Sequence, residues 1–127
     1  MLDSFVYGEV SRISPEAPIP VLRIERCQMM LGGAGNAARN LSALGCQVRF
    51  FSAGGDDAEA GRIRELLDAL PDSRAFLERE RGRQTPVKTR YVAHGQQLLR
   101  ADNETATAVS RETLEKLLAA FSASPAR

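Results

Sequence analysis

Residues 32–40 read Gly32-Gly33-Ala34-Gly35-Asn36-Ala37-Ala38-Arg39-Asn40, a glycine turn running directly into a helix predicted over 36–44 and stopped by Gly45. Glycines allow the backbone to approach a ligand closely, and the first helical turn offers unpaired N–H groups that bind oxygen atoms. Asn36 adds a side chain that can both donate and accept hydrogen bonds. The pattern indicates a small-ligand site, although a tight connection without a ligand also fits a turn of this composition.

A dinucleotide-binding turn is a second interpretation, because residues 33–38 fit the pattern G-x-G-x-x-A. Such a turn requires a buried parallel strand directly before it. Residues 21–26 instead alternate apolar and charged side chains, which is typical of a half-exposed strand. Asp56 and Asp57 lie near the position of a ribose-binding acid, but they are predicted to cap the helix that follows them. The dinucleotide interpretation is therefore the less favoured one.

The composition indicates one soluble globular domain of 127 residues, with 43% hydrophobic and 26% charged residues. A net charge of +1 provides no field that would attract nucleic acid or an anionic membrane, so neither is expected as a partner. The sequence has no apolar run of membrane-spanning length and no signal-peptide pattern, and a cytoplasmic location is expected. Cys27 and Cys46 lack metal-site or redox spacing, so no metal site is expected, and Cys46 is predicted to be a small buried hydrophobe.

Hydrophobic periodicity predicts the elements of the first half. Residues 4–13 and 21–26 alternate and are joined by a proline-rich loop, which predicts an antiparallel pair with one solvated face. Residues 48–53 are predicted to form a short apolar strand, and residues 58–70 a helix that ends at Pro71. The order of strands and helices favours a parallel α/β layer.

The second half begins with a variable, charged stretch over residues 72–84, in which the arginine-rich residues 79–83 are interpreted as a solvated loop. Two strands are predicted at 85–93 and 96–101, with His94 and Gly95 as their turn rather than His94 as a base. Ser110 is predicted to cap a last helix whose inward residues are Leu114, Leu117, Leu118 and Phe121, before a frayed end at 122–127.

Three further segments accompany the glycine turn: residues 11–21 (SRISPEAPIPV), 85–90 (TPVKTR) and 95–100 (GQQLLR). Together with the turn they resemble the PfkB-type, ribokinase-like carbohydrate kinases, and most closely the members that act on D-glycero-β-D-manno-heptose 7-phosphate. Such a kinase is often one half of a bifunctional heptokinase–adenylyltransferase. The resemblance covers nearly the whole chain, weakening over residues 72–84 and the last helix. It implies a partial ribokinase-like α/β fold. A parallel α/β layer would occupy about 32–71 and 109–121, and an antiparallel β lid about 4–26 and 85–101.

The resemblance also implies a reaction, in which ATP with Mg²⁺ phosphorylates the anomeric hydroxyl of heptose 7-phosphate for lipopolysaccharide core synthesis. Family members begin with a central strand ending in Gly-Asp and carry, further on, a Gly-Ala-Gly-Asp turn with the catalytic base, and an ATP pocket. None of these is matched in the 127 residues, so we expect an acceptor-binding part, inactive alone, without catalytic, ATP-binding or metal-binding residues. A stand-alone sugar-phosphate-binding or dimerisation module is the alternative, and the product of a broken gene is a third possibility.

By the same resemblance, sugar hydroxyls are expected to bind at Asp3, Gly32, Gly33 and Asn36, although a plain turn or cap aspartate fits Asp3 equally well. Lys88 and Arg90 are two apart in a predicted strand, so both project from one face. A point charge and a fork of donors on one face suit the sugar's phosphate, although a solvated strand face is the ordinary alternative.

Arg100 and Arg12 are weaker candidates for the same phosphate role. The lid strands also form a dimer contact in several family members. Phe5, Tyr7 and Ile13 fit either such a homodimer contact or internal packing.

Overall fold

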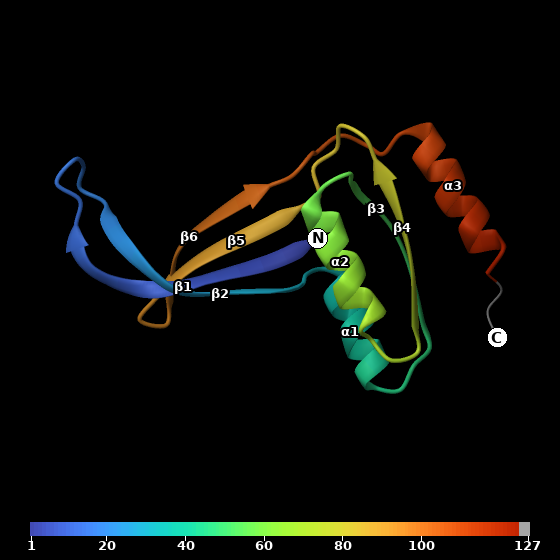
Figure 1. The fold of residues 1–127 in the computed structure, drawn as a ribbon, viewed down its shortest axis with the longest axis horizontal. Coiled ribbons are helices and arrows are strands. Elements are labelled where there is room, and N and C mark those ends of the chain that lie inside the picture. The colour runs from blue at the N-terminus through green and yellow to red at the C-terminus, as the bar shows by residue number, and fades with distance from the viewer. Residues whose placement is uncertain (125–127) are drawn as a thin grey trace.

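A computed structural model describes residues 1–124 as a long four-stranded sheet beside a smaller α/β layer (Figure 1). The long sheet has the strand order β2-β1-β5-β6, where β1 is Leu2–Ile13, β2 is Pro20–Leu31, β5 is Val87–Ala93 and β6 is Gln96–Asn103. The α/β layer consists of α1 (Ala34–Ala43), β3 (Val48–Gly55), α2 (Ala58–Asp68) and β4 (Ser73–Glu80). The last helix, α3, spans Arg111–Ser122. The predicted α/β class is confirmed.

The long sheet joins the first and last thirds of the chain. β1 and β2 form the predicted antiparallel pair, with Leu2 opposite Leu31 and Ile13 opposite Pro20. β1 also pairs in parallel with β5, and β5 pairs antiparallel with β6. The turn between β5 and β6 has φ of 51° at His94 and 77° at Gly95, the left-handed values that a two-residue hairpin turn requires.

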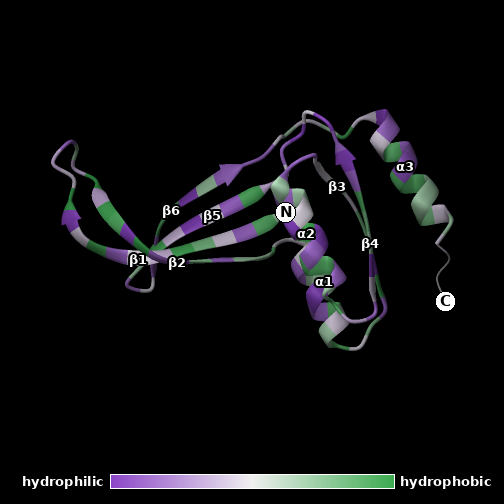
Figure 2. Cartoon of the chain, viewed as in Figure 1, coloured by the Kyte–Doolittle hydropathy of each residue, from purple (hydrophilic) through white to green (hydrophobic). Residues whose placement is uncertain are grey.

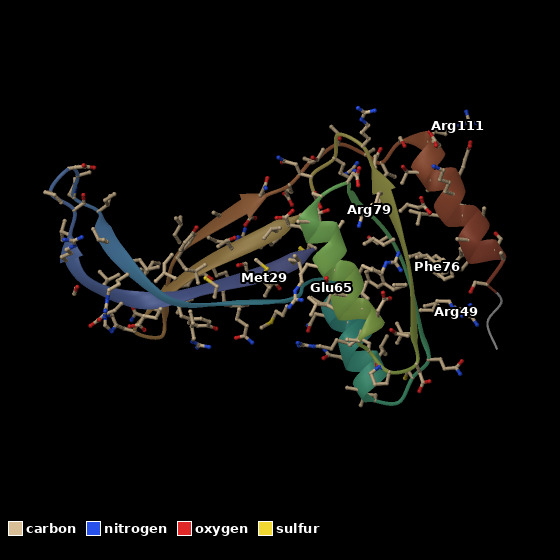
Figure 3. All side chains as sticks on the ribbon, in the orientation of Figure 1. Met29, Arg49, Glu65, Phe76, Arg79 and Arg111 are labelled. Carbon is tan, nitrogen blue, oxygen red and sulfur yellow. The ribbon has the colours of Figure 1, made fainter. Side chains whose placement is uncertain are left out.

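The hydrophobic core lies where the long sheet meets the α/β layer, and the central buried residues are Leu2, Leu31, Ala38, Val48, Ile63 and Leu67. From β3 and β4, Phe50, Ala75 and Leu77 pack against this core. The opposite face of the β3–β4 sheet carries Phe51 stacked on Phe76, with ring centroids 4.7 Å apart, and Phe121 of α3 edge-on to Phe51. Phe76 points from β4 toward α3 (Figure 3). Helices therefore cover both faces of this small sheet.

The structure corrects the interpretation of residues 72–84 as a variable, charged stretch. Residues 73–80 form β4, which pairs in parallel with β3 from Val48–Ser73 to Gly55–Glu80. The expectation of a solvated loop for residues 79–83 holds only in part: Arg81 and Gly82 form an exposed turn, but β4 continues to residue 80 and the side chain of Arg83 is only 11% exposed. Arg83 donates to Glu80 at 2.6 Å and to the carbonyl oxygen of Thr107 at 2.8 Å. Three consecutive apolar residues, 75–77, are flanked by charged residues in this segment, which obscured the strand.

Three smaller expectations are also wrong. Cys46 is exposed, because it lies in the connection between α1 and β3 rather than inside a strand. Asp56 does not cap α2 but pairs with Arg79 at 3.1 Å, whereas Asp57 caps the helix as predicted. Ser110 caps α3 and Phe121 packs against Phe51 while staying 63% exposed, but Leu114 and Leu118, which were also expected to point inward, are 46% and 55% exposed.

These α3 residues stay exposed because the helix has only the narrow β3–β4 sheet to pack against, which leaves apolar residues along it in contact with solvent (Figure 2). Of the predicted frayed end, Ser122 is the last residue of α3, and residues 125–127 lie outside the described residues. Among the helices described, none is both long enough and apolar enough to cross a membrane.

Candidate functional site

Asp3 and Gly32 form the centre of the candidate site. Asp3 on β1 is opposite Met30 on β2, so the chain brings Gly32 beside it just after β2 ends. A Cβ atom at position 32 would lie 2.7 Å from Asp3 Oδ2, which is closer than a real side chain tolerates. Glycine is therefore needed at this position for the Asp3 carboxylate to keep its place.

The turn after Gly32 positions α1. Gly33 is the N-cap residue and has φ of 53°, a left-handed value that favours glycine. At Gly35 a Cβ would lie 3.1 Å from the Cβ of Leu31, so the glycine lets α1 pack closely against the end of β2. Asn36 lies in the first turn of α1, where its Oδ1 accepts from Arg39 at 2.7 Å. Since the strand before the turn is antiparallel, the parallel strand needed for dinucleotide binding is not there.

Arg90 fixes the orientation of the Asp3 carboxylate. Its NH1 donates to Asp3 Oδ1 at 2.6 Å, and the two side chains are 23% and 19% exposed. The two oxygens of Asp3 thus have different neighbours, with Arg90 at Oδ1 and Gly32 at Oδ2. Because a guanidinium carries five N–H donors and a carboxylate about four acceptor sites, both groups keep further hydrogen-bonding capacity.

Lys88 and Arg100 converge on a single carboxylate that the sequence analysis did not single out. Asp102 Oδ2 lies 2.8 Å from Lys88 Nζ, and Asp102 Oδ1 lies 2.9 Å from Arg100 Nε. Glu104 approaches Lys88 at 3.9 Å. The hydrogen bond from Lys88 holds the pKa of the Asp102 carboxyl below its usual range, and the charge of Arg100 adds to this effect.

Strand register puts these groups on one face of the long sheet. Asp3, Lys88 and Asp102 are opposite one another across β1, β5 and β6, and the next row on the same face contains Phe5, Arg90 and Arg100. The expectation that Lys88 and Arg90 share a face is confirmed. Arg12 is not brought to them, because it is an exposed residue near the far end of β1.

Two aromatic rings continue this face away from Asp3. Phe5 and Tyr7 are stacked with centroids 6.0 Å apart. The guanidinium of Arg90 lies 5.2 Å from the Phe5 ring, and that of Arg26 lies 3.8 Å from the Tyr7 ring. Phe5 and Tyr7 are therefore packed against cations of their own sheet, whereas Ile13 is 59% exposed.

Thr85 anchors the start of β5 to the α/β layer. It is 2% exposed, and both its N–H and its hydroxyl donate to Asp57, at 2.8 and 2.7 Å. The Thr85 hydroxyl also accepts from the N–H of Gly55 at 2.7 Å. Burial raises the pKa of the Asp57 carboxyl, but the hydrogen bonds from Thr85 and Ala60 outweigh it, so the pKa is below the usual value. This network fixes Lys88 and Arg90 relative to α2.

Within residues 1–124, no group of three or more His, Cys, Asp or Glu side chains is arranged to hold a metal ion.

Comparison with protein-family models matches residues 1–124 to the pfkB family of carbohydrate kinases. Because the match covers almost the entire sequence, this chain belongs to the pfkB family of carbohydrate kinases.

Among curated proteins, the chain is 51% identical over 118 residues to the Bifunctional protein HldE of Paramagnetospirillum magneticum. The alignment covers 93% of this chain and 24% of that protein. The corresponding protein of Acidiphilium cryptum is 48% identical, with the same coverage. The chain thus spans about a quarter of the length of the curated relatives that it matches.

Solved structures confirm the ribokinase-like fold. A putative sugar kinase from Clostridium perfringens matches with a TM-score of 0.65 at 17% identity, covering 94% of this chain and 38% of that one. A ribokinase from Cryptococcus neoformans in complex with ADP matches with a TM-score of 0.57 at 18% identity, covering 80% of this chain and 31% of that one.

Proposed function

We propose that this chain is the acceptor-binding and lid part of an ATP-dependent sugar kinase whose acceptor is heptose 7-phosphate. The observation that carries the proposal is the Asp3 carboxylate, which lies against Gly32 and is oriented by Arg90 on the same sheet face as Lys88. A carboxylate beside a glycine turn suits the hydroxyls of a sugar, and cations on the same face suit a phosphate.

In this proposal the sugar ring is held at the glycine turn. Asp3 Oδ2 accepts from sugar hydroxyls while Oδ1 remains bonded to Arg90. Gly32 and Gly33 allow the ring to approach the backbone closely, and the Asn36 amide adds a further polar contact. A rigid, correctly oriented acceptor is what phosphoryl transfer most requires from this side of a kinase.

The phosphate of the acceptor is bound in this proposal by Lys88, Arg90 and Arg100. Arg90 can hold Asp3 through one nitrogen and still present other N–H donors to the phosphate. Lys88 and Arg100 contribute positive charge from neighbouring strands on the same face.

The choice of heptose 7-phosphate rests on the family resemblance of residues 11–21, 85–90 and 95–100. It is supported by the similarity to the Bifunctional protein HldE, because the heptose kinases that the chain resembles are often one half of a bifunctional protein. The whole kinase would transfer the γ-phosphate of ATP to the anomeric hydroxyl in the cytoplasm, for lipopolysaccharide core synthesis. The related fold of a ribokinase in complex with ADP supports ATP as the donor. ATP and Mg²⁺ belong in this proposal to the whole kinase, and no step is assigned to them within residues 1–124.

A stand-alone sugar-phosphate-binding or dimerisation module is the second candidate function. One observation favours it: the far part of the long sheet carries an apolar groove of about 370 Å³, lined by Ile19, Pro20, Leu22, Tyr91, Leu98 and Leu99. Exposed apolar side chains gathered in one place are typical of an association surface, so homodimerisation through the lid belongs to both candidates. Sedimentation of the chain and of a Leu99→Lys variant tests it. A monomer at every concentration would argue against the dimer.

Calorimetric titration with heptose 7-phosphate tests the acceptor site. We expect wild-type chain to bind, and Asp3→Asn and Gly32→Ala to bind at least about tenfold more weakly, since each disturbs one charged hydrogen-bonding group. Asp56→Asn is the matched control, because among residues 1–124 this carboxylate pairs only with the exposed Arg79, away from the site. Equal binding by Asp3→Asn and wild type would overturn the assignment.

A turnover assay with ATP, Mg²⁺ and heptose 7-phosphate separates the two candidates from an active enzyme. The expected result is no turnover by the 127-residue chain. Measurable turnover would show that the chain contains a catalytic centre and would contradict the proposal.

A further inference from the structure

We propose that Asp102 is an internal anion that occupies the phosphate position of the acceptor site and is displaced when a sugar phosphate binds. The inference rests on the proposed function and adds a residue that determines which anions the site accepts. It starts from the way in which Lys88 and Arg100 reach the same carboxylate from two strands, at 2.8 and 2.9 Å.

The geometry of Asp102 resembles that of a bound anion. One oxygen faces an ammonium and the other a guanidinium, which is the arrangement that a phosphate would adopt between the same two cations. Asp102 is also in the same cross-strand row as Asp3 and Lys88, so its carboxylate lies on the face that carries the sugar contacts.

The balance of charges around Asp102 determines how tightly this cluster binds an incoming phosphate. The three cations Lys88, Arg90 and Arg100 are matched by the three carboxylates Asp3, Asp102 and Glu104, so this cluster of six side chains carries no net charge. A phosphate that arrives at this face gains two cations only if Asp102 releases them. Free inorganic phosphate has only Arg90 besides these two cations to offset that loss, whereas a sugar phosphate also gains hydrogen bonds at Asp3 and Gly32. Displacing Asp102 lowers the affinity for both ligands by the same factor, so inorganic phosphate alone binds poorly, while the sugar contacts keep a sugar phosphate bound.

Titration with inorganic phosphate and with heptose 7-phosphate tests this inference on the 127-residue chain. We expect Asp102→Asn, which keeps the shape and removes the charge, to bind inorganic phosphate about tenfold more tightly than wild type. Glu104→Gln is the matched control, since it makes the same change in net charge but lies 3.9 Å from Lys88. It should change phosphate affinity by less than about twofold, as expected of an exposed pair.

Three outcomes overturn the inference: unchanged phosphate affinity in Asp102→Asn, an equal gain in Glu104→Gln, or a gain for inorganic phosphate that heptose 7-phosphate does not share. Asp102→Ser serves as a second variant if circular dichroism shows that Asp102→Asn is misfolded. The Lys88→Ala variant shows whether a negative result means that the inference about Asp102 is wrong or that the proposed phosphate site is wrong. If heptose 7-phosphate binds Lys88→Ala as tightly as wild type, the phosphate site itself is wrong, whatever Asp102 does.

Discussion

The α/β layer and the long sheet differ in what holds them in place. In the layer, Ala38, Ile63 and Leu67 are at most 3% exposed and form a continuous core with the near ends of β1 and β2. In the long sheet, every residue of β6 is exposed, and the candidate site consists of ion pairs on one face. The comparison teaches that stability and recognition are carried by different elements, so each can be changed with limited effect on the other.

The largest effect is expected from an apolar truncation in the layer. Leu67→Ala should lower the free energy of unfolding by about 2–5 kcal/mol, because Leu67 is 1% exposed and its removal leaves a cavity. Leu99→Ala, the same chemical change at a residue that is 59% exposed, should cost less than about 0.5 kcal/mol. Urea denaturation of both variants measures the contrast. Equal destabilisation would mean that the long sheet is stabilised by burial that the monomer does not show.

The second-largest effect on stability is expected at Thr85, which connects the long sheet to the α/β layer. Thr85→Val keeps the side-chain volume but removes a hydroxyl that donates to Asp57 and accepts from Gly55, so we expect a loss of about 1–3 kcal/mol in the free energy of unfolding. Asp56→Asn, which alters only an exposed pair with Arg79, is the control and should change stability little. A Thr85→Val variant as stable as wild type would show that the network does not hold β5 to the layer.

The contribution of Asp57 to the same connection should appear in the pH dependence of stability. Its pKa is lower in the folded state than the value near 3.9 of an unfolded aspartate, so its stabilisation is present above that value. The stabilisation disappears as pH falls through the folded pKa, and Asp57→Asn should have a shallower loss of stability below about pH 4. Thermal unfolding between pH 6 and 2 measures this. Asp102→Asn, which removes an exposed carboxylate of the long sheet, should change the pH dependence of stability less than Asp57→Asn does. A larger change in Asp102→Asn would mean that the long sheet, and not the connection to the layer, carries the acid-sensitive stability.

The smallest expected effect is an increase in stability. Gly61 lies within α2, and a Cβ there would approach only the Arg79 guanidinium, at 3.9 Å, so Gly61→Ala should stabilise the chain by about 0.5–1 kcal/mol. Gly45 also has space for a Cβ, but its φ of 80° makes Gly45→Ala destabilising. Thermal denaturation of the two variants should therefore give shifts of opposite sign. A stabilising Gly45→Ala would contradict the backbone conformation described for that turn.

The elements with clear local signals could be predicted from the sequence. Alternation identified the β1–β2 pair, Asp57 and Ser110 marked helix starts, and His94-Gly95 marked a hairpin turn. β4 was missed because its apolar residues are confined to Ala75, Phe76 and Leu77, while arginine and glutamate occupy the other positions after Ser73. The exposure of Phe121 could not be predicted, since it depends on how narrow the sheet beneath α3 is.

At the site, the sequence predicted which residues to examine but not how they pair. The shared face of Lys88 and Arg90 follows from strand periodicity. The pairing of Lys88 with Asp102 does not, because a regular hairpin closed by His94-Gly95 would place Ala101 opposite Lys88. A register shift between Tyr91 and Val92 moves Asp102 into that position. Such a bulge has no dependable signal in a single sequence.

The parallel pairing of β1 with β5 has a consequence for synthesis on the ribosome. The hairpin of β1 and β2 is complete once residue 31 has left the exit tunnel, but its partner strand begins only at Val87. At a translation rate of about 5–20 residues per second, one hydrogen-bonding edge of β1 waits unpaired for roughly several seconds. During that interval the nascent hairpin has an open edge to which another strand can pair. A chaperone should therefore capture a stalled chain that ends before residue 87 more often than one that ends after β6.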